Sequence, residues 1–267
     1  MRALRLVLRV FALVVLLLFS AIGPFIAPYS PTDAQPLKQN SPPDSEHLLG
    51  RDGLGRDTWS RLLWGAQGTL GSAALATLIA TLGGVALGSV AGAFGGIVDQ
   101  VVVHTLDMLL AIPGLLLALL ILSLMGDGLL QVSLSIGLSL MPAASRLVRA
   151  TVLDVRSRGY VESAYALGGD TWWVVRHHIL RNSIAAITSY ASIILAWSIL
   201  NVAAFDFLGL SGDLSIPGWG RMLNDARSYI HVSPMAFLAP GFAIVISVLS
   251  ITELSFEWQK HWWKLGQ

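Results

Sequence analysis

The histidines and acids of this 267-residue chain are few, and their spacing limits the chemistry they could perform. The sequence has six histidines and no cysteine, which excludes thiolate nucleophiles, thiolate metal sites and disulfides. His177 and His178 are poor partners for one metal ion, because adjacent residues of a helix point to different sides. Only His104 and Asp107 bring a histidine and an acid together in an apolar segment. Nucleotide-binding, hydrolase and zinc-protease motifs are also absent. The sequence therefore does not predict an enzyme or a metal site.

The most informative spacing lies in residues 160–182, a polar segment between two apolar ones. Helix-forming residues up to Leu167 are followed by the glycine pair 168–169, which predicts a short helix with a glycine stop. Asp170 or Thr171 can then cap a second short helix. The segment is therefore predicted to form an exposed helix–turn–helix knob.

Composition places this knob in a membrane protein. The chain is 54% hydrophobic with a mean hydropathy of +0.68, and only 12% of its residues are charged. Soluble domains carry roughly a quarter of charged residues. The net charge of +1 gives no reason to expect a nucleic-acid partner.

Six segments lack charged residues, and a spanning helix needs roughly 20 predominantly apolar residues. The segments are 10–32, 62–98, 108–126, 128–145, 182–205 and 232–252. The predicted fold class is an all-α integral membrane protein with six transmembrane helices. Pro113 is expected to kink the third span, and the glycine-rich residues 93–99 to turn between two adjacent helices. Asp206, near the outer end of the fifth span, is expected to be solvated.

Two features of the spans leave alternatives open. The glycines of the second span, at 83, 84, 88, 92 and 95, let helix backbones approach closely, which suits a packed bundle and a pore-lining helix equally. The first span also resembles a signal peptide, but its apolar run is long enough that an uncleaved span is favoured. Lysines and arginines concentrate on the side of both termini and of residues 160–182, which predicts that these parts are cytoplasmic.

Three motifs together resemble one family. Residues 49–52 and 54–57 read Leu-Gly-Arg-Asp twice, followed by Ser-Arg and a glycine at 65. Residues 207–210 read Phe-Leu-Gly-Leu and precede a proline and a Trp-Gly pair, and residues 162–168 match a Glu-Ala-Ala motif with a spaced glycine. This order resembles permease subunits of bacterial ABC importers of the dipeptide, oligopeptide and nickel family. The chain looks closest to the second, C-type, permease, with residues 224–230 similar to the nickel branch.

The resemblance implies a type I importer fold with cytoplasmic coupling helices, forming half of a translocation pore for peptides or nickel and metal chelates. It implies four kinds of partner: a second homologous permease subunit, two ABC ATPase subunits, an extracytoplasmic substrate-binding protein and the lipid bilayer. ATP and Mg²⁺ would be used by the ATPase subunits, with no cofactor on this chain. The implied location is the bacterial inner membrane, with several spans.

The resemblance also implies which residues carry the function. The expected ATPase-coupling residues are Glu162, Ser163, Ala164, Leu167, Gly168, Gly169, Trp172 and His178. Glu162 would be an electrostatic contact, Ala164 and Gly168 would allow close seating, and Trp172 with the adjacent Trp173 would supply apolar docking surface. The pore or vestibule candidates are Asp107, Pro113, Trp219, Asp225 and Arg227. A structural role, such as pairing with an arginine of the cytoplasmic loop, is the alternative for Asp107.

The expected organisation has four segments. Residues 1–32 hold the first span, 33–69 an extracytoplasmic loop with an interfacial helix, 70–255 a five-helix permease core with its coupling loop at 156–182, and 256–267 a cytoplasmic tail. The chain departs from the family pattern at Ser163, Arg181 and residues 252–258. A permease for another solute class, a self-sufficient channel and a membrane-embedded enzyme are the alternative functions.

Overall fold

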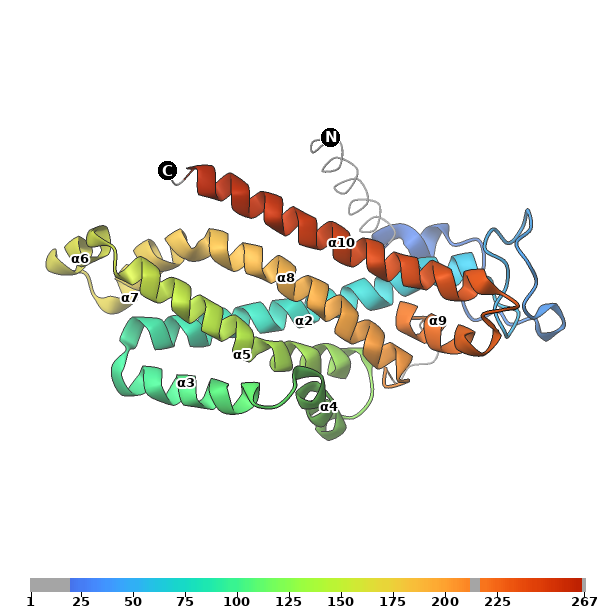
Figure 1. Ribbon diagram of the computed structural model, residues 1–267, viewed down its shortest axis with the longest axis horizontal. Helices are drawn as coiled ribbons and strands as arrows, with labels where there is room; N and C mark the ends of the chain where they lie inside the picture. The colour runs from blue at the N-terminus through green and yellow to red at the C-terminus, as the bar shows by residue number, and fades with distance from the viewer. Residues whose placement is uncertain (1–19, 212–216, 266–267) are drawn as a thin grey trace. The chain divides into compact units, whose positions relative to one another are not determined.

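The computed structural model describes residues 20–211 and 217–265. Apart from one isolated β-bridge between Arg51 and Asp57, every described element is helical. In chain order the elements are η1 (Pro36–Lys38), α2 (Thr58–Phe94), α3 (Gly96–Leu110), α4 (Gly114–Met125), α5 (Leu129–Arg156), α6 (Gly159–Ala166), α7 (Thr171–Val174), the π-helix η2 (Val175–Ile179), α8 (Leu180–Phe207), α9 (Trp219–Ala226), η3 (Arg227–Tyr229) and α10 (Pro234–Leu265) (Figure 1). The all-α prediction is confirmed.

Four of the described helical stretches are long and apolar enough to cross a membrane: 58–94, 129–156, 171–207 and 234–253. A fifth span results if α3 and α4 are counted as one. Four of the six predicted spans therefore correspond to α2, α5, the α7–α8 stretch and α10. Most of the first predicted span lies outside the described residues, and its described part is helical from 20 to 26.

The third predicted span, 108–126, was expected to kink at Pro113, and the structure has one helix on either side of this residue. Its residues belong to α3 and α4, whose axes are bent by 93° at a short break. Pro113 occupies this break and directly precedes α4. Proline has no amide hydrogen and its ring clashes with the preceding turn, so the α3 helix cannot continue through it. The predicted kink is confirmed, but it divides the segment into two helices.

The described chain forms two compact units, each built from several parts of the sequence. One unit comprises residues up to 75 together with 122–133 and 195–254, and the other comprises 76–121, 134–194 and the residues from 255 onward. The first unit contains the long loop before α2 together with α9. The second contains α3, α6 and α7, and with them the predicted coupling loop.

The glycine stripe of α2 lies against α5 in the second unit. A Cβ atom added at Gly84 would lie 2.6 Å from the Cβ of Ala144, and one added at Gly88 would lie 2.5 Å from the carbonyl oxygen of Ser145. These distances are shorter than any real Cβ contact, so only glycine allows the two backbones to come so close. The glycines therefore form a packed interface with α5, which is one of the two roles that the sequence left open.

The helix predicted near the end of the loop before α2 is present, and it is continuous with α2. Asp57 caps it, because its Oδ2 accepts a hydrogen bond from the Ser60 backbone N–H at 2.7 Å. From Thr58 the helix continues without a break for 37 residues. The boundary drawn at residue 69 thus falls inside α2.

Candidate functional site

The predicted knob is formed by α6 and α7, which Figure 1 shows beyond the ends of α5 and α8. α6 stops before Gly168, whose φ of +90° is a conformation that glycine adopts without strain. Asp170 caps α7, accepting a hydrogen bond from the Trp173 backbone N–H at 3.0 Å. The predicted helix, glycine stop and cap are confirmed. The second helix is not short, however, because no glycine or proline interrupts 171–207 and η2 joins α7 to α8.

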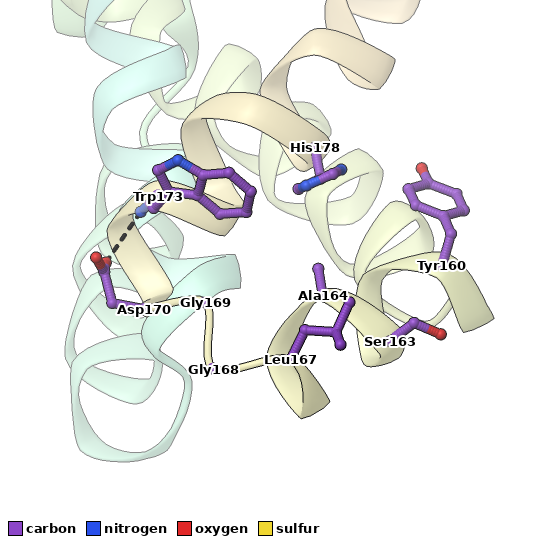
Figure 2. Close-up of a pocket in the computed structure, with 9 residues that line it drawn as sticks. All are labelled: Tyr160, Ser163, Ala164, Leu167, Gly168, Gly169, Asp170, Trp173 and His178. Carbon is purple, nitrogen blue, oxygen red and sulfur yellow. Dashed lines mark hydrogen bonds between the residues drawn. The ribbon is translucent and has the colours of Figure 1, made fainter.

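A groove of about 560 Å³ opens between the two arms of the knob (Figure 2). Its lining consists of Tyr160, Ser163, Ala164, Leu167, Gly168, Gly169, Asp170, Trp173 and His178. Six of the eight predicted coupling residues are thus brought together around one concave surface. The other two, Glu162 and Trp172, are exposed and do not line it.

Aromatic rings form one side of the groove, and the sequence reasoning did not predict the contacts between them. The Trp173 ring stacks on His177 with centroids 5.0 Å apart and meets His178 edge-on at 5.1 Å. His177 has the i,i+4 spacing that an ordinary helix brings together, whereas His178, at i+5, reaches Trp173 through the wider π-helical turn of η2. Tyr160 of α6 lies 6.4 Å from His178 on the other side. The adjacent histidines were a visible signal, but the contact of His178 with Trp173 depends on the π turn.

A hydrophobic cluster fixes the knob to the end of α5. Val161 and Ala164 of α6 and Val174 of α7 pack with buried valines of α5, among them Val152 and Val155. Burial of aliphatic side chains stabilises such a contact by roughly 1.5–3 kcal/mol for each fully buried residue. The knob is therefore packed against the end of α5 and the start of α8.

The outer surface of the knob has the composition of a docking surface. Leu167 is 89% exposed and Trp172 is 63% exposed, although both are large and apolar. Glu162 is exposed and makes no ion pair within the described part of the chain. Exposed apolar residues beside a concave surface are typical of protein contact sites.

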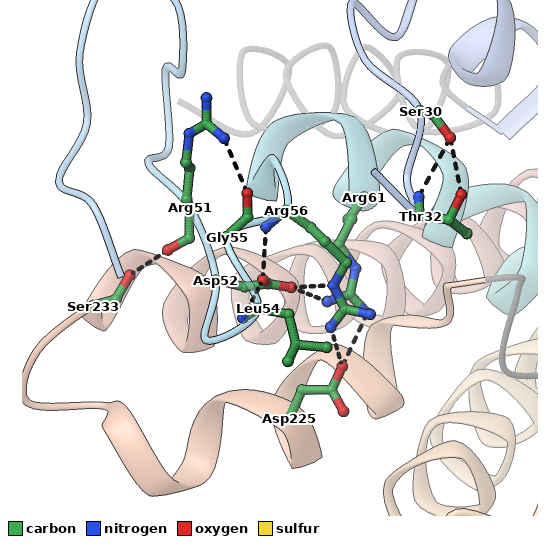
Figure 3. A network of polar contacts seen from close by, with 10 residues as sticks. All are labelled: Ser30, Thr32, Arg51, Asp52, Leu54, Gly55, Arg56, Arg61, Asp225 and Ser233. Atoms are coloured by element: carbon green, nitrogen blue, oxygen red, sulfur yellow. Dashed lines mark hydrogen bonds and ion pairs between the residues drawn. The ribbon is translucent and has the colours of Figure 1, made fainter. Parts of the chain in front are cut away.

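The duplicated Leu-Gly-Arg-Asp motif forms a second polar centre, in the other unit (Figure 3). Asp52 accepts hydrogen bonds from the Leu54 and Arg56 backbone N–H groups at 2.9 and 3.0 Å, and pairs with the side chains of Arg56 and Arg61. Both arginines also contact one oxygen of Asp225, each at 3.0 Å. Burial works to raise the pKa of Asp52, but the charges of Arg61 and Arg56 outweigh it and hold that pKa below its usual value. The motif therefore ties the outer loop to α2 and α9.

Residues of the same motif also form hydrogen bonds with the buried side chain of His47. The Nη2 of Arg51 lies 2.5 Å from Nε2 of His47, and Nδ1 of His47 lies 2.8 Å from Asp57. Because arginine only donates, Nε2 accepts and Nδ1 carries the proton that is donated to Asp57. Gly50 has a φ of +71°, and a Cβ there would lie 2.6 Å from the Ser41 carbonyl oxygen. The glycines of this motif are therefore required by the fold of the loop.

The pore and vestibule candidates lie in different surroundings. Trp219 is 1% exposed, with its backbone N–H bonded to Thr69 Oγ1 and its indole N–H to the Leu62 carbonyl, both at 3.0 Å. Asp225 belongs to the arginine network, whereas Arg227 is exposed. Trp219 and Asp225 thus have structural contacts that explain them within this chain.

Asp107 lies on α3 and pairs with Arg146 of α5. Pairing with an arginine is the structural role that the sequence analysis gave as the alternative for Asp107. The arginine, however, lies within helix α5 and not in a loop. Asp206 was expected to be solvated, but it is 3% exposed and accepts a hydrogen bond from Ser211. Gly218 and Gly220 pack directly on Asp206, which shields its carboxylate from solvent.

Comparisons with known proteins identify this architecture. A chain of the MetNI methionine ABC transporter, solved in inward-facing conformations, superposes with a TM-score of 0.62 at 18% identity, covering 75% of this chain and 95% of that one. The likeness defines the fold as that of a type I ABC importer transmembrane domain. The family described as "Binding-protein-dependent transport system inner membrane component" matches residues 84–261.

Two curated relatives agree with this assignment. The glutathione transport system permease protein GsiD of Pectobacterium atrosepticum is 35% identical over 215 residues, which are 80% of this chain and 71% of that protein. The dipeptide transport system permease protein DppC of Alkalihalophilus pseudofirmus is 33% identical over 233 residues, covering 87% and 77%. The chain therefore belongs to the binding-protein-dependent transport inner membrane components. It is a C-type permease subunit of an ABC importer.

Proposed function

We propose that this chain forms one half of the translocation pore of an importer for small peptides. The supporting observation is its similarity, over most of its length, to permeases named for glutathione and dipeptides. Neither name mentions a metal, so we propose peptides rather than nickel as the substrate class. A second permease subunit would complete the pore, and a substrate-binding protein would deliver the peptide.

The proposed contact with the ATPase is the knob of α6 and α7. Its groove, its exposed Leu167 and Trp172 and its unpaired Glu162 support this role. Two ATPase subunits would use ATP and Mg²⁺, and their closure would push the knob. The buried valine cluster would carry that movement into α5 and α8.

The proposed topology has six spans in a bacterial inner membrane, with both termini and the knob in the cytoplasm. Eleven of the 17 lysines and arginines lie near the two termini or in residues 146–181, and this bias supports the orientation. The first span is proposed from the apolar run 10–32, of which residues 20–26 are described as helical.

Charge reversal at Glu162 tests the proposed coupling. Glu162→Arg in the complete importer should leave the assembled complex in the membrane while its binding protein no longer stimulates ATP hydrolysis. Asp154→Arg is a matched control, because Asp154 is an exposed acid near the end of α5, outside the knob of α6 and α7. Unchanged peptide uptake by Glu162→Arg would contradict the assignment.

A cross-linking experiment tests the same contact directly. Because the chain has no cysteine, a single Leu167→Cys variant gives one reactive thiol on the knob. It should cross-link to the ATPase subunit, whereas Leu54→Cys, on the exposed outer loop, should not. If reconstitution of this chain alone gave solute flux without ATP, a self-sufficient channel would replace the proposal.

A further inference from the structure

Two ion pairs join α3 and α5, and they differ in geometry and exposure. Arg149 donates to both carboxylate oxygens of Asp99, at 2.5 and 2.6 Å, and these side chains are 28% and 19% exposed. Arg146 contacts a single oxygen of Asp107, and these side chains are 55% and 47% exposed. The Asp99 pair is therefore a closed clamp between the helices, whereas the Asp107 pair is open on one side.

The open pair also lies further along the spans. At about 1.5 Å per residue, Asp107 is about 17 Å from the start of α3, and Arg146 is about 15 Å from the end of α5. Asp99 is only about 5 Å from the start of α3. The hydrocarbon core of a bilayer is about 30 Å thick. Charged groups within membrane-spanning helices are unfavourable against lipid, so the open side of this pair is expected to face water or protein.

The exposed surface of α3 has a polar edge that leads to this pair. Gln100, His104 and Asp107 are spaced by four and three residues, which places them on one face of the helix, and all three are exposed. On the adjacent face Val101 and Met108 are 60% and 72% exposed. One edge of α3 is therefore suited to a water-filled passage and the other to lipid or an apolar partner.

We propose that Asp107 and Arg146 form a substrate contact on the translocation path, which takes the α-ammonium and α-carboxylate groups of a small zwitterionic peptide. The inference rests on the proposed peptide-importer function. Within the described residues the second oxygen, Oδ2, of Asp107 has no hydrogen-bond partner, and it can accept the ammonium. The guanidinium of Arg146 has further N–H groups that can donate to the carboxylate.

The chemistry of the pair makes this contact transient. The pair and a zwitterionic peptide are each neutral overall, so binding exchanges one ion pair for two and leaves no charge unpaired. When the peptide leaves, Asp107 and Arg146 pair again, so the protein itself competes with its substrate. Weak binding of this kind suits a transport path, in which a solute must enter readily and also leave.

The first experiment measures the ATP hydrolysed per peptide imported by the complete importer in proteoliposomes. Asp107→Asn and Arg146→Gln should each raise this ratio about tenfold, the size expected for loss of one charge-assisted contact, while the binding protein still stimulates ATP hydrolysis. Asp99→Asn is the matched control, because it breaks the closed clamp and should leave the ratio unchanged. A wild-type ratio in Asp107→Asn, or an equal rise in Asp99→Asn, overturns the inference.

The second experiment does not depend on the charge variants being stable. In the cysteine-free chain, His104→Cys should react with a charged, water-soluble thiol reagent, and a saturating zwitterionic dipeptide should slow that reaction. Val101→Cys, on the apolar edge, should stay unreactive. An unreactive His104→Cys, or one that the peptide does not protect, also overturns the inference. If the wild-type importer transports no peptide at all, the proposed function itself fails, which is a distinct result.

Discussion

Asp52→Asn removes the central charge of the outer-loop network, and the structure indicates how much this should cost. The Asp52 side chain is 5% exposed and that of Arg61 is 3% exposed, so the substitution leaves a buried guanidinium without its main partner. Breaking a buried ion pair in this way costs about 3–5 kcal/mol. Because Arg61 keeps its contact with Asp225, we expect a loss near the lower limit, about 3 kcal/mol.

Asp225→Asn is the matched comparison. It removes a carboxylate from the same two arginines, but the Asp225 side chain is 32% exposed and both arginines keep Asp52. Partly exposed pairs contribute about 1 kcal/mol or less. The two variants should therefore differ by about 2 kcal/mol, which is roughly a thirtyfold difference in the local opening equilibrium.

Hydrogen exchange of the outer-loop amides measures this difference. The N–H groups of Asn40, Arg51 and Asp52 donate to loop carbonyls at 2.9–3.0 Å, so they report when the loop opens. Their exchange should be about a hundred times faster in Asp52→Asn and only several times faster in Asp225→Asn. Equal effects of the two substitutions would refute the argument that burial sets the strength of this network.

Further variants test other parts of the fold. Because the pKa of Asp52 is lowered in the folded protein, its stabilising contribution should be constant at neutral pH and be lost only as the pH falls below about 4, through the lowered pKa, as exchange of the Arg51 amide against pH would show. Gly88→Leu should disrupt the α2–α5 interface and lower the yield of folded protein in detergent, whereas Gly71→Ala, at a site with open space, should be neutral or slightly stabilising. Gly168→Ala should strain the knob by roughly 1–2 kcal/mol and reduce binding-protein-stimulated ATP hydrolysis, because its φ is +90°.

Some features of the knob are predictable from short stretches of sequence, and others are not. The α6 stop at Gly168 and the Asp170 cap depend on residues within one turn, so the sequence predicts them. The same holds for the tight turn between α2 and α3, where Gly95 and Gly96 have φ values of 65° and 55°. The rings that line the groove were not predictable in this way, because they meet only through the π turn and the packing of α6 against α7.

The remaining features depend on contacts between distant parts of the chain. Asp225 lies 169 residues from Arg56, and nothing in the spacing of either motif indicates that they pair. Asp206 is expected to be solvated from its place near a helix end, yet Gly218 and Gly220 from a later segment cover it. Burial depends on every element that packs around a residue, so a local pattern cannot determine it.

Composition and charge spacing alone thus determine that this protein is helical, lies in a membrane and carries an exposed knob, because hydropathy and helix termination are properties of short segments. The tertiary structure decided that the glycine stripe is a packed interface, that Pro113 separates two helices, and that the repeated Leu-Gly-Arg-Asp motif holds the outer loop to α9. Each of these depends on which surfaces meet once the whole chain has folded.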